Sequence, residues 1–488
     1  MSKVEVGGLI VLFGATGDLA ERQLYPAFHQ LYQRGQLTQE FAIIGAARTQ
    51  LTENEFKEHV RKAVEAGGNY TKFEESFLDH IYYQPADNTK VGDFEKLMTK
   101  IKEVSTTHNT DERYLYYYSI APSIYDETTV NLKDSGITGL TGEHRVVVEK
   151  PFGYSFESAK EYYDILKKSF SEDEIYLIDH FPGMDFVQNI MATRFYNPFI
   201  EGMWNKDFIE NIQINLPERL EVGDRGAFYD ENGALLDMFQ NHILQILSFI
   251  IMDLPNEFEK DAIHNAKHAA LSNIPTFTKD EVKEYVVRGQ YSADSEGEYK
   301  HYRDETDVAK DSHTETYIAI QLSVDNERWQ GVPVYVRTGK ALVEQFSSVD
   351  IILKERNGDS QDTPSRMTFY IEPGKGLSLV LNQKDISSDM QPITTFIGPD
   401  EKNFSEEYIP SPYENLLHDA LEGDNTLFSS WSEVQEQWRI TDAIKEAWSN
   451  MSEPVFPNYQ ATSFGPSSAD RLLSRNNHEW IKRVNLKE

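Results

Sequence analysis

The sequence predicts an α/β domain with a parallel sheet, followed by a larger α+β domain with a mainly antiparallel sheet. The chain has 488 residues, which is too long for one hydrophobic core. Its first third alternates short apolar runs with helical patterns, and from about residue 205 longer alternating strands take over. We therefore place one boundary after residue 178, giving domains 1–178 and 179–488.

The first domain is predicted from apolar runs that each precede a helical pattern. LIVLFG (9–14) is followed by LYPAFHQLYQRG (24–35), and FAIIGAAR (41–48) is followed by NEFKEHVRKAVEAG (54–67). Short apolar runs that alternate with helices of this length are typical of βαβ units on a parallel sheet.

The second domain is predicted from longer strands in which apolar and polar residues alternate. Examples are IENIQINLPE (209–218), TYIAIQLSVD (316–325) and VPVYVRTG (332–339). This period of two indicates an antiparallel sheet, which helices pack against. The charged stretch 292–312 is predicted to be a solvated surface loop.

The charge and cysteine content limit the possible partners. Forty-seven Lys and Arg against 80 Asp and Glu give a net charge of −33, which repels nucleic acid and anionic lipid. There is no cysteine, so disulfides and thiolate chemistry are absent, as suits a cytoplasmic protein. The most apolar late segment, 242–254, is shorter than the ~20 residues that span a bilayer. We expect no nucleic-acid or membrane partner and no metal.

A nucleotide site is predicted where Gly14 and Gly17 lie between an apolar strand and a helix. Glycines there let the backbone approach a pyrophosphate, although Leu12 replaces the first glycine of GxGxxG, and a plain strand–turn–helix would fit the motif alone. A second strand follows at the spacing of a βαβ unit. It ends in Arg48 and Thr49 instead of the acid that binds a ribose 2′-hydroxyl. An arginine there takes a 2′-phosphate, which favours NADP over NAD, unless it is simply an exposed side chain.

Six motifs, taken together and in order, resemble the glucose-6-phosphate dehydrogenase family. They are GATGDLA, EKPFG (149–153), IDH (178–180), GALLDMFQNH (233–242), YVRTGK (335–340) and GPSSADRLL (465–473). The resemblance runs from about residue 8 to about residue 475. It implies a Rossmann domain followed by an α+β domain whose open, mainly antiparallel sheet forms a homodimer interface. It also implies that hydride passes from the sugar C1 to NADP, giving a 6-phosphogluconolactone, in the oxidative pentose phosphate pathway.

The resemblance also implies catalytic roles. His242 matches the general base that removes the C1 hydroxyl proton, and Asp179 matches the carboxylate that orients it. A histidine has a pKa near working pH, and a carboxylate stabilises the imidazolium that forms. Asp237 lies five residues before His242, about 140° around an α-helix, so these two need not share a helical face. Lys150 matches the lysine between substrate and nicotinamide, and the peptide before Pro151 is cis in relatives.

Three further positions match family residues that hold sugar hydroxyls: Glu218, Asp237 and Lys340. Buried polar groups aimed at hydroxyls discriminate strongly, because an analogue without the hydroxyl leaves them unpaired. The residues assigned to the cofactor are Gly14, Thr16, Gly17, Asp18, Leu19, Arg48, Thr49 and Lys150.

The sequence departs from the family where relatives grip the 6-phosphate. LIDHFPGMDF (177–186) keeps His180, but Phe181 replaces a tyrosine and Met184 replaces a lysine. Gln23 and Gln345 likewise stand where basic residues are expected. A charge-assisted hydrogen bond to phosphate contributes ~1.5–3 kcal/mol, so these changes predict weaker phosphate binding.

Three hypotheses remain open. The chain oxidises glucose 6-phosphate and meets the phosphate with other cations, such as Lys206, Arg219 or Arg225. Alternatively, it oxidises an unphosphorylated or differently C6-substituted hexose. In the third, it is a non-catalytic member that binds nucleotide, which the intact Lys150 and His242 argue against.

Overall fold

The computed structural model describes residues 4–67, 72–110, 112–355, 364–372, 376–384, 390–397, 410–452 and 454–482. The chain divides into two compact units. The first comprises Met1–Met184, Glu259–His264 and Ile409–Trp431, and the second comprises Asp185–Phe258, Asn265–Tyr408 and Ser432–Glu488. The units therefore divide a few residues past position 178, and two later segments belong to the first unit.

The first unit is built on a six-stranded parallel sheet with the order β3-β2-β1-β4-β5-β6. This is the strand order of the Rossmann fold, which confirms the predicted fold class for this unit. The strands are β1 (Val6–Phe13), β2 (Leu37–Ala47), β3 (Ile81–Pro85), β4 (Arg113–Tyr118), β5 (Glu143–Val148) and β6 (Ile175–Leu177). Its main helices are α1 (Tyr25–Gln33), α2 (Glu53–Ala66), α3 (Val91–His108), α4 (Tyr125–Asp134), α5 (Phe156–Leu166) and α12 (Pro412–Glu422).

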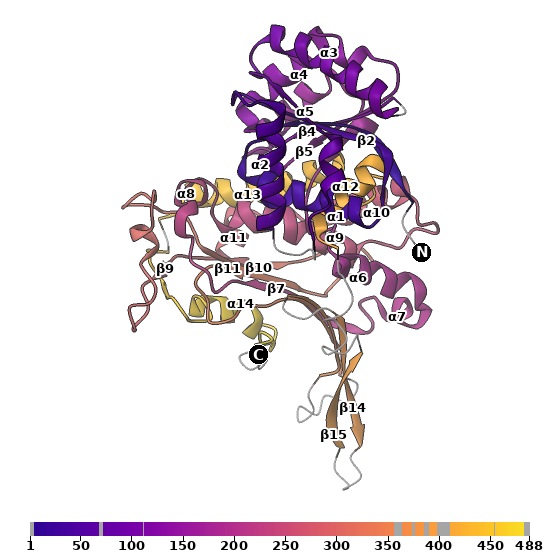
Figure 1. The fold of residues 1–488 in the computed structure, drawn as a ribbon. Helices are drawn as coiled ribbons and strands as arrows, with labels where there is room; N and C mark the ends of the chain where they lie inside the picture. The colour runs from indigo at the N-terminus through magenta and orange to yellow at the C-terminus, as the bar shows by residue number, and fades with distance from the viewer. Residues whose placement is uncertain are drawn as a thin grey trace. The chain divides into compact units, whose positions relative to one another are not determined.

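Local sequence signals explain where these elements begin. From Leu9 to Phe13, every residue of β1 is fully buried, as expected for a central parallel strand covered on both faces. Helix α2 begins with a capping box, in which the Thr52 hydroxyl accepts from the Glu55 amide and the Glu55 carboxylate accepts from the Thr52 amide. Helix α12, far along the chain, packs beside α1 and against β1 (Figure 1).

The second unit is built on an eight-stranded sheet with the order β15-β14-β13-β12-β7-β11-β10-β8. Only β7 and β11 run parallel among these neighbours, so the sheet is open and mainly antiparallel, as predicted. The strands are β7 (Ile209–Pro217), β8 (Val286–Gly289), β10 (Tyr317–Leu322), β11 (Val334–Gly339), β12 (Ser347–Leu353), β13 (Arg366–Glu372), β14 (Gly376–Lys384) and β15 (Met390–Ile397). Two short strands, β9 (Tyr291–Ser292) and β16 (Tyr459–Gln460), pair separately.

The second unit contains several helices, three of which share a buried ion pair. They include α6 (Asp185–Tyr196), α7 (Pro198–Met203), α8 (Gly226–Ala234), α9 (Leu244–Ile251), α11 (Lys279–Tyr285) and α14 (Asp470–Ser474), with most of α10 (Lys260–Ser272) and α13 (Trp431–Ser449). Lys267 of α10 lies 2.8 Å from Glu433 of α13, and both side chains are fully buried. Gln245 of α9 donates to the same carboxylate at 3.0 Å. Breaking such a pair leaves a buried charge uncompensated, so it holds the three helices in register.

One helical stretch of the described residues, Gly223–Ile251, is long and apolar enough to cross a membrane by length and composition. Its most apolar window is entirely buried within the protein. Core helices meet the same criterion, so this stretch is weak evidence for membrane insertion.

The charged stretch 292–312 is not simply a solvated loop. Tyr302 is fully buried and Val308 nearly so, and both belong to an aromatic cluster with Tyr229 and Tyr291. The Tyr302 hydroxyl donates to Asp230 at 2.8 Å. The prediction was wrong here because two apolar anchors are hidden in a run of charges.

Candidate functional site

The predicted nucleotide-binding turn follows β1 directly. Gly14 has a φ of +80°, and an added Cβ would lie 1.9 Å from the Ser119 carbonyl oxygen. Only glycine fits there, and the Gly17 amide then donates to the Gly14 carbonyl at 2.9 Å, closing the turn. The helical turn that follows places backbone N–H groups at this edge of the sheet, which suits a pyrophosphate.

Arg48 and Thr49 follow β2, the strand beside β1, and both are exposed. The Thr16 hydroxyl lies 3.4 Å from the Thr49 hydroxyl, so the glycine turn and the end of β2 meet. Asp18 pairs with Arg22 at 2.6 Å on the surface, and Leu19 is half-buried. The residues assigned to the phosphates and the ribose therefore lie together at the carboxyl end of the sheet, where ligands bind in Rossmann folds.

Lys150 and Asp179 lie at this same edge. They follow β5 and β6, which are parallel neighbours that pair Val148 with Leu177. Asp179 is buried, and its Oδ1 accepts from the Phe181 amide at 3.0 Å. The Lys150–Pro151 peptide is cis, as the family resemblance implies.

Glu149 is a half-buried residue that sequence reasoning did not single out, although it belongs to EKPFG. Burial raises its pKa to about 7, against the opposing effects of the Tyr117 hydroxyl bond and the Lys150 charge. The Tyr117 hydroxyl donates to this carboxylate, and the Tyr413 hydroxyl lies 3.5 Å from it. A group with this pKa next to Lys150 changes charge within the working pH range.

The turn 180–184 is packed tightly by apolar contacts. Phe181 is buried, 4.9 Å between ring centroids from half-buried His180, and the Met184 amide donates to the Phe181 carbonyl. Asn415 of α12 donates to the Gly183 carbonyl at 3.0 Å. A fixed turn therefore presents His180 and the neutral, half-buried Met184.

In the second unit, Glu218 and Lys340 form an ion pair. Glu218 follows β7 and Lys340 follows β11, and these two strands are parallel neighbours that pair Pro217 with Gly339. Parallel strands end at the same edge of a sheet, which brings the two side chains together. The Glu218 amide also donates to the Gly339 carbonyl at 2.9 Å. The structure thus brings together two of the three predicted hydroxyl-binding residues.

Asp237 and His242 lie on a π-helix, Leu235–Ile243, and not on an α-helix. Backbone hydrogen bonds in a π-helix join residues five apart, so these two lie on the same side of the helix. The expectation of about 140° between them was therefore wrong. Both side chains are buried, and Asp237 lies 3.5 Å from the Arg225 guanidinium.

The start of this helix is held by Glu315. Its Oε1 accepts from the Leu235 amide at 2.9 Å, and its carbonyl accepts from the Ala234 amide at 3.1 Å. Gly233 has a φ of +62°, and an added Cβ would lie 2.3 Å from the Glu315 carboxylate. Burial raises the pKa of Glu315 to about 7.

Tyr229 is a further residue at this site that no sequence motif predicted. It is buried, and the Lys340 ammonium lies 5.9 Å from its ring centroid. Burial, followed by the negative charges of Asp237 and Glu218, raises its pKa well above the usual value. Tyr229 therefore remains a neutral hydrogen-bonding phenol beside the hydroxyl-binding residues.

Of the remaining predicted positions, Gln23, Gln345 and Arg225 are exposed and Lys206 is half-buried. Gln23 lies on the π-helix Ala20–Leu24 of the first unit, and Gln345 follows the buried Glu344 in the second. Lys206 precedes β7, whereas Glu218 follows it, and nine strand residues span ~30 Å. Lys206 therefore lies too far from Glu218 to share its site, while Arg225 lies within reach through Asp237.

The first unit has a Rossmann sheet with a glycine turn at its carboxyl edge, and the second unit has buried acid, base and lysine groups, a combination typical of a dinucleotide-dependent oxidoreductase. Residues 11–189 match the NAD-binding domain of glucose-6-phosphate dehydrogenase, and residues 191–481 match the C-terminal domain of the same enzyme. The chain belongs to the glucose-6-phosphate dehydrogenase family.

Relatives match over nearly the whole chain. Glucose-6-phosphate 1-dehydrogenase of Leuconostoc mesenteroides is 36% identical over 98% of this chain and 99% of its own. The Bacillus subtilis enzyme of that name is 37% identical, with 97% and 98% covered. A solved glucose-6-phosphate dehydrogenase in complex with glucose 6-phosphate superposes with a TM-score of 0.90 at 28% identity, covering 99% of this chain and 100% of that one.

Proposed function

We propose that this protein oxidises the C1 hydroxyl of glucose 6-phosphate to 6-phosphogluconolactone with NADP. The observation that carries the proposal is the retention of Lys150, Asp179 and His242 in family motifs that keep their order. The names of the full-length relatives support the same substrate.

Each residue has a chemical task in this proposal. His242 accepts the proton of the C1 hydroxyl, and the role that the family resemblance implies for Asp179 is to stabilise the imidazolium. Lys340, Glu218 and Tyr229 offer charged and neutral hydrogen-bonding groups to the sugar hydroxyls. Arg225, fixed near Asp237, is a cation available to an anionic substrate.

The choice of NADP over NAD is supported by the exposed Arg48 and Thr49 at the end of β2. The match to an NAD-binding domain is compatible with either dinucleotide, and the helical turn after Gly14 offers backbone N–H groups to a pyrophosphate. When bound, the nicotinamide supplies the hydride acceptor. An arginine at the end of this strand suits a 2′-phosphate, so Arg48→Ala should raise the KM for NADP and leave that for NAD unchanged.

A hexose with a neutral or different C6 substituent is the second candidate substrate. The observation that favours it is the turn 180–184, where Phe181 is buried and Met184 offers no charge. In this case the same proton transfer at C1 takes place, but the phosphate contributes nothing to recognition.

The open sheet of the second unit supports a homodimer, since the family resemblance assigns the dimer interface to it. The absence of cysteine supports a cytoplasmic location.

The test is reduction of NADP followed by absorbance with glucose 6-phosphate, with the sugar product trapped and identified. The proposal predicts one lactone per NADPH. No NADPH from glucose 6-phosphate, with the dinucleotide shown to bind, would overturn it.

A further inference from the structure

A basic pocket of about 590 Å³ lies at the edge of the eight-stranded sheet, beside β8. Its cations are Lys279, Lys283, Arg288 and Arg471, and none of the described residues that line it is Asp or Glu. The chain as a whole has 80 acids against 47 bases, so this local composition reverses the general charge of the protein. We call it the β8 pocket.

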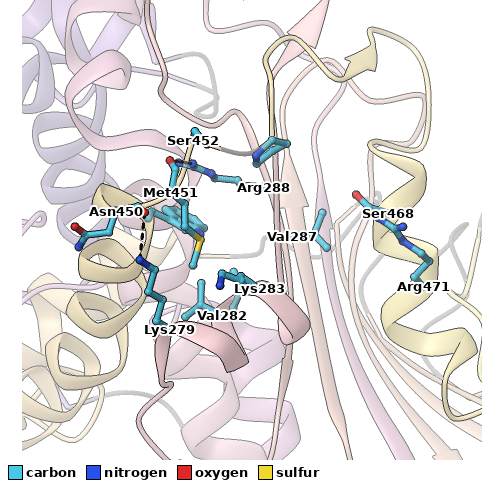
Figure 2. Close-up of a pocket in the computed structure, with 13 residues that line it drawn as sticks. Lys279, Val282, Lys283, Val287, Arg288, Asn450, Met451, Ser452, Ser468 and Arg471 are labelled. Carbon is cyan, nitrogen blue, oxygen red and sulfur yellow. Dashed lines mark hydrogen bonds between the residues drawn. The ribbon is translucent and has the colours of Figure 1, made fainter.

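Three of the cations, Lys279, Lys283 and Arg288, lie on the same side of the β8 pocket. Lys279 and Lys283 are four residues apart on α11, and therefore lie on the same face of that helix. Figure 2 shows them with Met451 and Arg288 on one side of β8, and Arg471 on the other. Neighbouring strand residues point to opposite faces, and Val287 accordingly points away from Arg288.

Two of these cations are held in place by the protein. The Arg288 guanidinium lies 5.1 Å from the ring centroid of Trp448 and 5.6 Å from that of Phe456. Lys279 donates to the Asn450 carbonyl at 3.3 Å, as Figure 2 shows. A donor that is already positioned loses less freedom when a ligand binds.

Lys283 also pairs with an acid, Asp280, which would compete with an anion in the pocket. Its ammonium lies 3.0 Å from Asp280, but both side chains are more than half exposed. Exposed pairs of this kind are weak, so an anion in the pocket can draw Lys283 away from Asp280.

These features identify the class of ligand. An arginine fork with two lysines suits the oxygens of a phosphate group. The volume falls within the ~300–1,000 Å³ of small-molecule pockets, and Val282, Met451 and Trp448 provide apolar wall for an organic part. We propose that the β8 pocket binds a small organic phosphate, independently of the dinucleotide turn in the first unit.

The test is calorimetric titration of ADP into the full-length protein in the presence of saturating NADP, which fills the dinucleotide site. One ADP should bind per chain. The double variant Lys279→Gln, Lys283→Gln alters two exposed side chains and should weaken that binding about tenfold or more.

The matched control is Lys354→Gln. Lys354 is also exposed and also donates to a backbone carbonyl, that of Lys206, at 2.6 Å, but it lies outside the β8 pocket. Its variant should bind ADP like the unaltered protein. Absence of ADP binding once NADP is saturating, or equal affinity in the double variant, would overturn the proposal.

Discussion

Two strand-end regions of this protein differ in what they have kept from the family. In the second unit, the ends of β7 and β11 hold Glu218 and Lys340 as an ion pair. In the first unit, the turn after β6 has Asp179 and His180 but carries Phe181 and Met184 where the family resemblance predicts a tyrosine and a lysine. By that resemblance, the residues expected for proton transfer and for the sugar hydroxyls are retained, while those expected for the phosphate are reduced. We infer that recognition of C1 and recognition of C6 can change separately.

The largest expected effect comes from removing the base. His242→Asn should lower kcat by about 10²–10⁴-fold, because general-base catalysis contributes that much. Steady-state NADP reduction measures it, with His268→Asn, a change to a half-exposed histidine beside Glu436, as the control. A kcat within threefold of the unaltered enzyme would remove His242 from the mechanism.

The second-largest effect is expected from the ion pair between Glu218 and Lys340. Lys340→Met removes a charged hydrogen-bond donor proposed to bind a sugar hydroxyl, and it also breaks the ion pair with Glu218. The loss of that contact should cost about 2 kcal/mol of transition-state binding, or about 30-fold in kcat/KM. Comparison of the double variant Lys340→Met, Glu218→Gln with the two single variants measures the coupling free energy between the two residues. Additive effects would show that the two residues act independently.

A smaller effect is expected from rebuilding the phosphate contact. Met184→Lys should lower the KM for glucose 6-phosphate about tenfold, because a lysine there adds a charge-assisted hydrogen bond. The KM for unphosphorylated glucose serves as the control and should not change. An equal shift for both sugars would show that Met184 does not lie at the phosphate.

The smallest effect is expected from two carboxyl groups with raised pKa values, the half-buried Glu149 in the first unit and the buried Glu315 in the second. Burial raises both pKa values from 4.5 to about 7. The folded protein thus binds these protons more tightly than the unfolded chain, so the stability that these two groups contribute is fully present below pH ~4.5 and is lost as pH rises to about 7.

Glu315→Gln keeps the acceptor for the Leu235 amide but has no proton to lose. The free energy of unfolding, measured by chemical denaturation, should fall between pH 5 and pH 8 in both proteins. The fall should be roughly 1–3 kcal/mol smaller in the variant than in the unaltered protein. Glu231→Gln, at an exposed carboxylate, should leave the pH dependence as it is. An unchanged slope for Glu315→Gln would mean that this carboxyl is ionised at pH 5.

The sequence predicted the parts of the fold and site that depend on local order. Strand–turn–helix spacing located the Gly14 turn, and alternation located β7 and β11, whose parallel pairing then places Glu218 beside Lys340. These features follow from residues close to one another in the chain, where periodicity carries the information.

What the sequence could not predict depends on contacts between distant residues. The π-helix that aligns Asp237 with His242 begins at a carboxylate about 80 residues away, Glu315. The α12 segment joins the first unit because Arg145 donates to the Leu421 carbonyl at 3.0 Å. No window of the sequence contains both partners of either contact.

Whether the substrate is phosphorylated is decided by the ratio of kcat/KM for glucose 6-phosphate to that for glucose, measured with NADP over one wide concentration range. We expect a clear preference for the phosphorylated sugar, because cations such as Arg225 are available to its charge. Equal or faster turnover of glucose would contradict this expectation, and would identify Phe181, Met184, Gln23 and Gln345 as marks of a changed substrate.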